Sequence, residues 1–251
     1  MRNLAPQPTR LAKYGGRIVP AQTVRRRIVV RRDTILRVCR ALAKGYGNPR
    51  LGNKANALDE LVYIILSTRT QDQTFRLTFT KLKAQFPSWN GVGNRDRRRI
   101  EGILRPAGLS KLKARQLLAI LERLRSSFGR ATLAPMHRLP NRQAEAFLTS
   151  LPGVASKVAK CVLMYSLRRQ VLPVDVHVHR VATRLGLKTK KRPDTSQDLI
   201  EGVIPPRLRY GFHVNAVAHG RAVCLPHAPR CDVCCIAKWC HYYRVRTAKA
   251  S

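Results

Sequence analysis

The sequence predicts an all-α protein, and two observations carry this prediction. Apolar residues recur at the spacing i, i+3, i+4, i+7, which places them on one face of a helix, in residues 144–151, 158–165 and 178–185. Strand-like alternation of apolar and polar residues is scarce along the whole chain. Each such face must be buried against another element, so we expect a protein built from helices packed on helices.

The earlier helices are predicted from their apolar faces and their end signals. Asp33 is expected to cap a helix that ends near Gly45. Residues 59–67 (DELVYIILS) are apolar on all sides, as in a central buried helix. Ser110 is expected to cap a further helix that runs to Gly129.

The charge of the chain indicates a polyanionic partner. With 49 Lys or Arg and 13 Asp or Glu in 251 residues, the formal net charge is +36. Nucleic acid is the commonest partner of such a surface, with a ribosomal or membrane-surface protein as the alternative. No apolar run is long enough to cross a membrane, and the first 25 residues lack the apolar region of a signal peptide. We therefore expect a soluble protein that is not secreted by that route.

Residues 1–32 contain nine Lys or Arg and no acidic residue. This composition predicts a disordered basic arm that attracts phosphates without sequence preference. A solvated tail or an organellar transit peptide is the alternative.

Residues 152–155 separate two predicted helices and are too few for anything but a tight hairpin. Backbone N–H groups at the start of the second helix would then face outward and form a nest for phosphate, from Gly153, Val154, Ala155 and Ser156. Lys157 and Lys160 lie off the apolar face of that helix and are expected to surround the nest with positive charge. An ordinary turn between helices is the alternative.

Five of the seven cysteines lie near the C-terminus, which favours a metal site over a disulfide framework. If Cys235 is left out, the spacing is C-x6-C-x2-C-x5-C, formed by Cys224, Cys231, Cys234 and Cys240. Thiolates suit both zinc and iron–sulfur clusters, so the spacing alone leaves both open.

Two motifs, LPGVASKVAKCVL and LPVDVHVHRVATRLGL, resemble the helix-hairpin-helix DNA glycosylases of the endonuclease III branch, and the resemblance covers about residues 33–244. It implies a two-lobed all-α fold. One lobe is a six-helix barrel domain, residues 50–169, that contains the helix-hairpin-helix. The other is an iron–sulfur cluster domain formed by residues 33–49 and 170–244, and a tail, residues 245–251, follows it.

The resemblance also implies a catalytic pair. The family carries a Lys in the second hairpin helix and an Asp in the next V-D-x-H segment, and these match Lys157 and Asp175. Breaking an N-glycosidic bond needs a nucleophile for C1′ and a negative group near the developing positive charge, and this pair can supply both. The alternatives are a phosphate contact for Lys157 and an N-cap for Asp175, and Asp175 can also combine capping with catalysis.

Other positions follow from the same resemblance. The four cysteines match the family's 4Fe-4S loop, and Arg69 and Leu109 match two loops that insert wedge residues into opened DNA. His177 matches a His beside the catalytic Asp, and we assign it to the pocket. Arg69 replaces the family's usual Gln, Ala155 replaces the second hairpin Gly, and Thr149 stands where an acidic residue is common. These departures leave the base preference open.

The expected function is base-excision repair by a DNA glycosylase with AP-lyase activity that removes damaged bases, oxidised pyrimidines in particular. Its partner is double-stranded DNA with damaged bases or abasic sites. The resemblance further implies a monomer, cytoplasmic and nucleoid-associated, or nuclear or mitochondrial in a eukaryote. The alternatives are a monofunctional glycosylase for mismatched or alkylated bases and a noncatalytic iron–sulfur DNA-binding protein.

Overall fold

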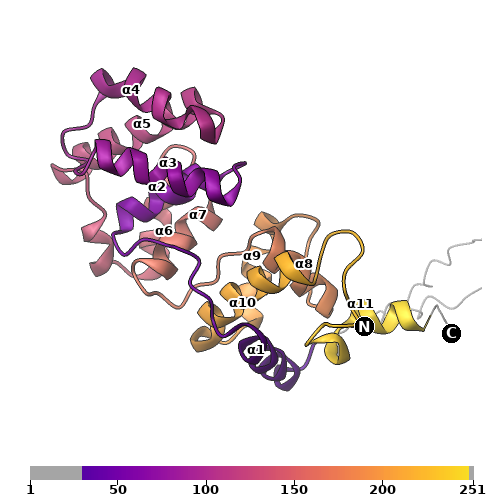
Figure 1. The fold of residues 1–251 in the computed structure, drawn as a ribbon. Coiled ribbons are helices and arrows are strands. Elements are labelled where there is room, and N and C mark those ends of the chain that lie inside the picture. Colours follow the sequence, from indigo (N-terminus) through magenta and orange to yellow (C-terminus); the bar gives the residue numbers. More distant parts are fainter. Residues whose placement is uncertain (1–29, 249–251) are drawn as a thin grey trace, which may run out of the picture.

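The computed structural model describes residues 30–248, and within this range the chain forms helices and no strand, which confirms the all-α prediction (Figure 1). The α-helices are α1 Arg32–Tyr46, α2 Ala57–Ser67, α3 Asp72–Gln85, α4 Arg97–Leu104, α5 Ser110–Phe128, α6 Asn141–Ser150, α7 Ser156–Tyr165, α8 Val176–Leu185, α9 Pro193–Val203, α10 Arg209–Ala222 and α11 His241–Thr247. None of them is long and apolar enough to cross a membrane. Most of the predicted arm, residues 1–29, lies outside the described part, as do residues 249–251.

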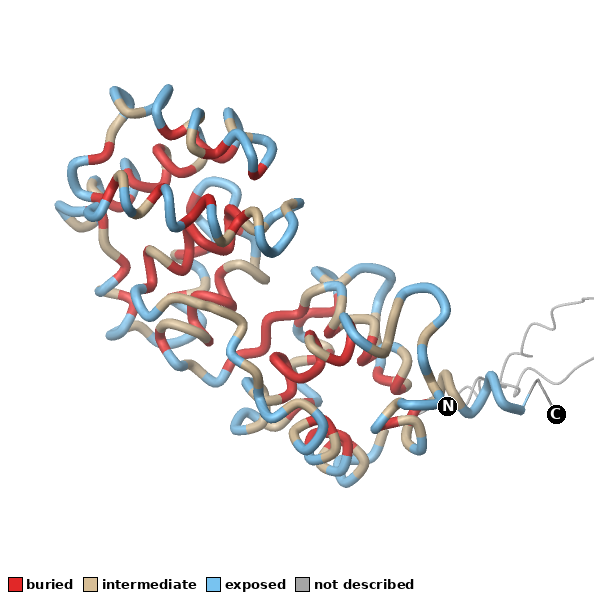
Figure 2. Tube along the Cα trace, viewed as in Figure 1, coloured by how far each residue is buried: buried red, intermediate tan, exposed pale blue. Residues whose placement is uncertain are grey.

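The buried apolar side chains of residues 30–248 form two clusters, one inside each of two lobes (Figures 1 and 2). The first cluster contains the apolar faces of α2–α7, which we call the barrel lobe. The second contains those of α1, α8, α9 and α10 together with the cysteine-containing loop, which we call, with α11, the cysteine lobe. The chain passes between the lobes before α2 and again between α7 and α8, so α1 packs on α10 although the two lie far apart in the sequence.

The observed helix ends agree with the predicted ones in part, and two predicted caps differ. As predicted, α2 is buried on almost every side, and α5 ends at Gly129, whose φ is 71°. Asp33, however, lies in the first turn of α1 and not at its cap, where its charge still favours the positive end of the helix. The capping position of α5 is Leu109 and not Ser110.

Lys160 is the predicted DNA contact that the structure contradicts. It is 4% exposed, and its ammonium forms an ion pair with Glu201 of α9, across the junction between the lobes. It also lies 3.8 Å from Glu145 Oε2 and 3.6 Å from Asp198 Oδ1. The physical reason is tertiary, because α9 covers the face of α7 that would meet solvent in a lone hairpin. Lys160 therefore joins the lobes and does not surround the hairpin with charge.

We expect Lys160→Met to lower the free energy of unfolding by about 3 kcal/mol, because it removes one partner of a buried ion pair. The effect should stay at the low end of the usual range, since Arg209 Nη1 lies 3.1 Å from Glu201 Oε1 and still neutralises that carboxylate. The measurement is urea unfolding followed by circular dichroism.

Arg97→Met is the control, because it breaks an exposed pair in which Arg97 Nε lies 2.9 Å from Glu101 Oε1. Its effect should stay within about 0.5 kcal/mol. Adding Glu201→Gln to Lys160→Met should restore part of the loss, since the unbalanced charge is then removed. If Lys160→Met and Arg97→Met have the same free energy of unfolding, Lys160 does not hold the lobes together.

Candidate functional site: the cleft between the lobes and a four-cysteine pocket

A cleft of about 810 Å³ opens between the barrel lobe and the cysteine lobe. Residues of α2, α3 and α7 line it from one side, and residues of α8, α9 and α10 line it from the other. Lys157 and Asp175 both line this cleft, one from each lobe. Its other charged lining residues are Arg69, Asp72, Arg76, Arg192, Asp194 and Arg221. The tertiary fold thus brings the predicted pair to one cavity.

Lys157 stands in the first turn of α7, and the preceding hairpin fixes where that turn begins. Gly153 has φ 69°, a conformation that side chains rarely adopt, and an added Cβ would lie 2.4 Å from Gln116 Nε2. The same Nε2 donates a hydrogen bond to the carbonyl of Pro152 at 3.1 Å. Glycine is therefore favoured at position 153, where any side chain would strain the backbone and displace the Gln116 amide.

The predicted phosphate nest is smaller than expected. Val154 is buried, and its N–H donates to the carbonyl of Leu151 at 3.2 Å, closing the turn. Its amide is therefore already used, which corrects the expectation that all four would face outward. The hydroxyl of Ser156 donates to Glu145 Oε1 at 2.7 Å, and this bond ties the start of α7 to α6. Gly153 and Ala155 are exposed at the tip of the hairpin.

Asp175 caps α8 through one oxygen only. Its Oδ1 accepts the N–H groups of His177 at 2.9 Å and Val178 at 2.8 Å. Among the described residues, its Oδ2 forms no hydrogen bond or ion pair, so this oxygen is available to a bound molecule. The extended segment before Asp175 is held by Gln197, whose Oε1 accepts the N–H of Val174 at 3.0 Å. Capping and a second role are compatible here.

His177 lies beside Asp175 in the cleft, as predicted for a pocket residue. Burial lowers the pKa of its imidazole, which favours the neutral ring. Arg180 Nη2 lies 3.1 Å from His177 Nδ1, and since a guanidinium can only donate, Nδ1 accepts in this contact. Gly220 permits the close approach of α10, because an added Cβ would lie 2.8 Å from His177 Cβ. His179, in contrast, turns away and its Nε2 lies 2.9 Å from the Lys190 carbonyl oxygen.

The two predicted wedge residues stand on neighbouring loops. Arg69 lines the cleft in a left-handed conformation with φ 53°, and Leu109 is 47% exposed with φ 52°. The hydroxyl of Thr70 donates to the carbonyl of Ala107 at 2.7 Å and so joins the two loops. Thr149, the third departure, uses its hydroxyl inside its own helix, donating to the carbonyl of Glu145 at 2.9 Å.

Two buried charged residues near these elements were not found from the sequence. Glu60 is fully buried and accepts hydrogen bonds from Lys54 N at 2.6 Å and from Asn53 Nδ2. Burial raises the pKa of Glu60 to about 7, and those hydrogen bonds oppose the shift. Lys113 is 3% exposed and bonds the loops that carry Arg69 and Leu109. Glu60 stands in the helix predicted to be buried, but no sequence signal indicates which groups would donate to it, and Lys113 stands in a run of ordinary helical sequence.

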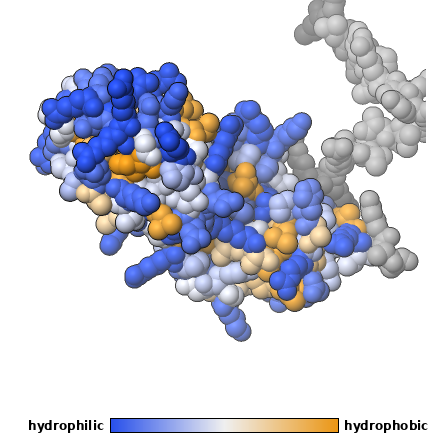
Figure 3. All heavy atoms as spheres, turned by 45° about the horizontal axis from the view of Figure 1, so that its top comes forward, coloured by the Kyte–Doolittle hydropathy of each residue, from blue (hydrophilic) through white to orange (hydrophobic). Residues whose placement is uncertain are grey.

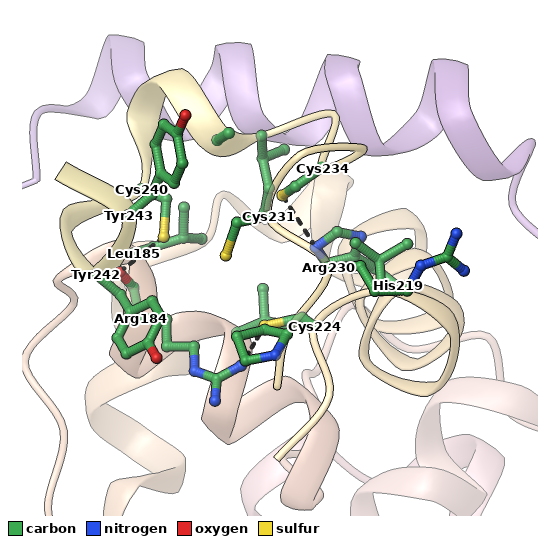
Figure 4. A pocket seen from close by; sticks show the side chains of 15 residues that line it. Arg184, Leu185, His219, Cys224, Arg230, Cys231, Cys234, Cys240, Tyr242 and Tyr243 are labelled. Carbon is green, nitrogen blue, oxygen red and sulfur yellow. Dashed lines mark hydrogen bonds between the residues drawn. The ribbon is translucent and has the colours of Figure 1, made fainter. Parts of the chain in front are cut away.

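The four cysteines of the predicted spacing line one pocket of the cysteine lobe, Cys224, Cys231, Cys234 and Cys240 (Figure 4). Cys235 is exposed and is not among its lining residues. It lies against α1, where a Cβ added at Gly45 would meet Cys235 Sγ at 3.5 Å. Cys235 therefore lies outside the pocket that the other four cysteines line.

Groups around this pocket suit an anionic thiolate centre. Arg184 Nη1 lies 3.2 Å from Cys224 Sγ, and His219 Nε2 lies 3.6 Å from Cys234 Sγ (Figure 4). Within residues 30–248, no group of three or more His, Cys, Asp or Glu is close enough to hold a single metal ion. The four cysteines that line the pocket can supply four thiolate ligands (Figure 4). The donor set therefore fits a 4Fe-4S cluster.

The surface is suited to a polyanion. The face in Figure 3 is mostly hydrophilic, with hydrophobic groups in separate patches over both lobes. Together with the net charge of +36, this favours binding of a phosphate backbone around the cleft. The fold and the cleft thus define an all-α protein with a hairpin, a lysine and a carboxylate at the junction of two lobes.

Comparison with known proteins identifies the family. Residues 62–206 match the HhH-GPD superfamily of base excision DNA repair proteins. A protein of Arabidopsis thaliana, provisionally named as a DNA glycosylase, is 35% identical over 168 residues, which are 66% of this chain and 57% of that protein. Endonuclease III of Thermotoga maritima is 27% identical over 198 residues, 79% of this chain and 89% of its own length. The chain belongs to the HhH-GPD superfamily and is an endonuclease III-like DNA glycosylase.

A solved structure supports the fold. The structure of a non-covalent endonuclease III–DNA complex superposes with a TM-score of 0.72 and 21% identity, covering 87% of this chain and 99% of that chain. The two-lobed helical fold predicted from the motifs is therefore confirmed. The matched family region contains the hairpin, Lys157 and Asp175, whereas the four cysteines follow it in the sequence.

Proposed function

We propose that the protein is a bifunctional DNA glycosylase and AP lyase that acts as a monomer on double-stranded DNA with damaged bases, oxidised pyrimidines in particular, or abasic sites. The observation that carries this proposal is that Lys157 and Asp175 line one cleft from opposite lobes. A lysine amine in the cleft can attack C1′ and form the imine that a lyase needs, whereas a monofunctional glycosylase uses water as the nucleophile. The protein would act in the compartment that contains its DNA, which is the cytoplasm with the nucleoid, or the nucleus or mitochondrion in a eukaryote.

The chemistry follows from the two groups. The damaged nucleotide leaves the base stack and enters the cleft. The neutral amine of Lys157 attacks C1′, a bond forms between Nζ and C1′, and the electron pair of the glycosidic bond leaves with the base. Asp175 Oδ2 lies at the cleft without a protein partner among the described residues and stabilises the positive charge that develops on the sugar. The nitrogen then loses a proton, the C1′–O4′ bond breaks with O4′ taking up a proton, and an imine forms between Nζ and C1′. Loss of a C2′ proton from this imine eliminates the 3′ phosphate.

The DNA is held from both lobes. At the hairpin tip, the amides of Gly153, Ala155 and Ser156 face a phosphate at the start of α7, where the helix dipole favours an anion. Val154 supports this turn from within. Arg69 and Leu109 contact the opened duplex, and His177 lines the pocket of the extruded base beside Asp175.

A panel of duplexes tests this function, with one oxidised pyrimidine, alkylated base, mismatch or abasic site in each. We expect base removal and strand cleavage on oxidised pyrimidines, and a covalent complex after borohydride reduction. Base removal without a trapped complex would mean a monofunctional glycosylase. Duplex binding with no base removal on any member would mean a noncatalytic DNA-binding protein and would overturn the proposal.

We also propose that Cys224, Cys231, Cys234 and Cys240 hold a 4Fe-4S cluster, which would fix the loop of residues 224–240 and place an anionic centre against Arg184. We expect about four iron atoms per chain and broad visible absorption in the wild type. Cys234→Ala should lose most of this iron. The measurement is iron content after anaerobic purification.

Cys235→Ala is the matched control, because Cys235 neighbours Cys234 in sequence but does not line the pocket. Its iron content should equal that of the wild type. Zinc in place of iron in the wild type would refute the cluster, and loss of iron from Cys235→Ala would show that the ligand set is wrong.

A further inference from the structure

Lys113 is a buried cation with no acidic partner in the described part of the chain. It stands in the first turn of α5 and is 3% exposed. Its ammonium donates to the carbonyl of Leu66 at 3.0 Å, to Thr70 Oγ1 at 2.7 Å and to the carbonyl of Ala107 at 3.0 Å. These three bonds use all three donors of the group. A buried charge is costly unless it is both paired with an opposite charge and hydrogen-bonded, and Lys113 has hydrogen bonds to neutral acceptors only. Its burial therefore needs a reason beyond packing.

The three acceptors belong to two separate segments. Leu66 lies in the last turn of α2, which ends at Ser67, and Thr70 is within the loop of residues 68–71 that follows. Ala107 ends the short turn before Gly108 and Leu109. Because the Thr70 hydroxyl also donates to Ala107, the three groups form one closed network. We call the loop of residues 68–71 the Arg69 loop and the segment of residues 105–109 the Leu109 loop.

Each loop contains a residue that would relax if it were free. Arg69 and Leu109 have φ of 53° and 52°, which costs roughly 1–2 kcal/mol for each residue with a side chain. Leu109 in addition exposes a large apolar side chain. Surrounding structure must hold such conformations, and the side chains of Lys113 and Thr70 bond the two loops together.

We propose that Lys113 is a positioning residue that locks the Arg69 loop and the Leu109 loop into one unit, so that both side chains meet the duplex together when a base is extruded. This inference rests on the proposed function, in which these loops contact opened DNA. Without the lock, each loop would have to be ordered anew upon binding. Base extrusion would then suffer, whereas chemistry on a base that is already unpaired would not.

The test compares single-turnover excision of one oxidised pyrimidine from a paired duplex and from the same sequence in an unpaired bubble. Lys113→Met keeps the length of the side chain and removes its donors. We expect it to slow excision from the paired duplex roughly 100-fold, as a misplaced binding group does, and from the bubble by less than about threefold. Lys81→Met, an exposed lysine of α3, is the control and should behave as wild type.

A second variant and a second measurement keep the test decisive. Thr70→Val removes the shared hydroxyl and leaves Lys113 in place, so it should show the same selective loss if Lys113→Met does not fold. The fluorescence of 2-aminopurine opposite an abasic-site analogue reports unstacking without any chemistry, and we expect both variants to reduce its rise. Equal slowing on paired and bubble DNA, or an unchanged fluorescence rise, would overturn the inference.

Failure of the proposed function gives a different result. A wild type that excises no lesion would refute the glycosylase proposal, while the fluorescence comparison would still decide whether Lys113 positions the loops. A wild type that excises normally, with Lys113 variants equally active on paired DNA, would refute the lock alone.

Discussion

Lys157→Ala is expected to abolish the complex that borohydride traps and to slow strand cleavage by more than about 10³-fold, a loss typical of removing a nucleophile. The side chain lines the cleft at the first turn of α7, and no other residue is proposed to attack C1′. Its removal takes away the atom that forms the imine. The measurement is gel-resolved trapping on abasic and lesion-bearing duplexes.

Lys157→Arg separates nucleophilicity from charge. A guanidinium keeps the positive charge beside the DNA but stays protonated and forms no imine. Its affinity for undamaged duplex should therefore resemble that of the wild type, while trapping is lost. If Lys157→Ala traps as well as the wild type, another amine is the nucleophile and the assignment is wrong.

Asp175→Asn is expected to slow base removal by roughly 10²–10³-fold, the usual cost of losing one group that stabilises charge in a transition state. Asn caps a helix as well as Asp does, so α8 should keep its start and the protein its stability. The substitution thus removes the charge and retains the cap. Single-turnover base removal is compared with equilibrium binding, which should change far less.

Asp194→Asn is the matched control, because Asp194 also lines the cleft but pairs with Arg192 at 2.7 Å. Base removal by this variant should stay within about threefold of wild type, as expected for an exposed ion pair of little energetic weight. An unaltered rate for Asp175→Asn would confine Asp175 to capping. Equal losses for both variants would point to the general charge of the cleft.

Features that depend on neighbours in the sequence were predictable. The spacing of apolar residues in 144–151 and 158–165 indicated two helices, because residues three and four apart lie on the same face of a helix. The few residues between these helices then indicated the hairpin. The cap at Asp175 followed from the residue type before an apolar helix. Each of these depends on a few consecutive residues, so local physics was sufficient.

Only the tertiary structure decided the partners of the polar residues on those helices. Lys157 and Lys160 stand in one helix and both looked free to face DNA, yet α9 covers Lys160 and leaves Lys157 at the cleft. Lys113 likewise finds two of its three acceptors, the Leu66 carbonyl and Thr70 Oγ1, in segments far away in the sequence. A sequence determines which residues can be buried. The carboxylates and hydrogen-bond acceptors that surround a buried cation, however, come from segments far away in the chain. The packing of the whole fold determines where those segments lie.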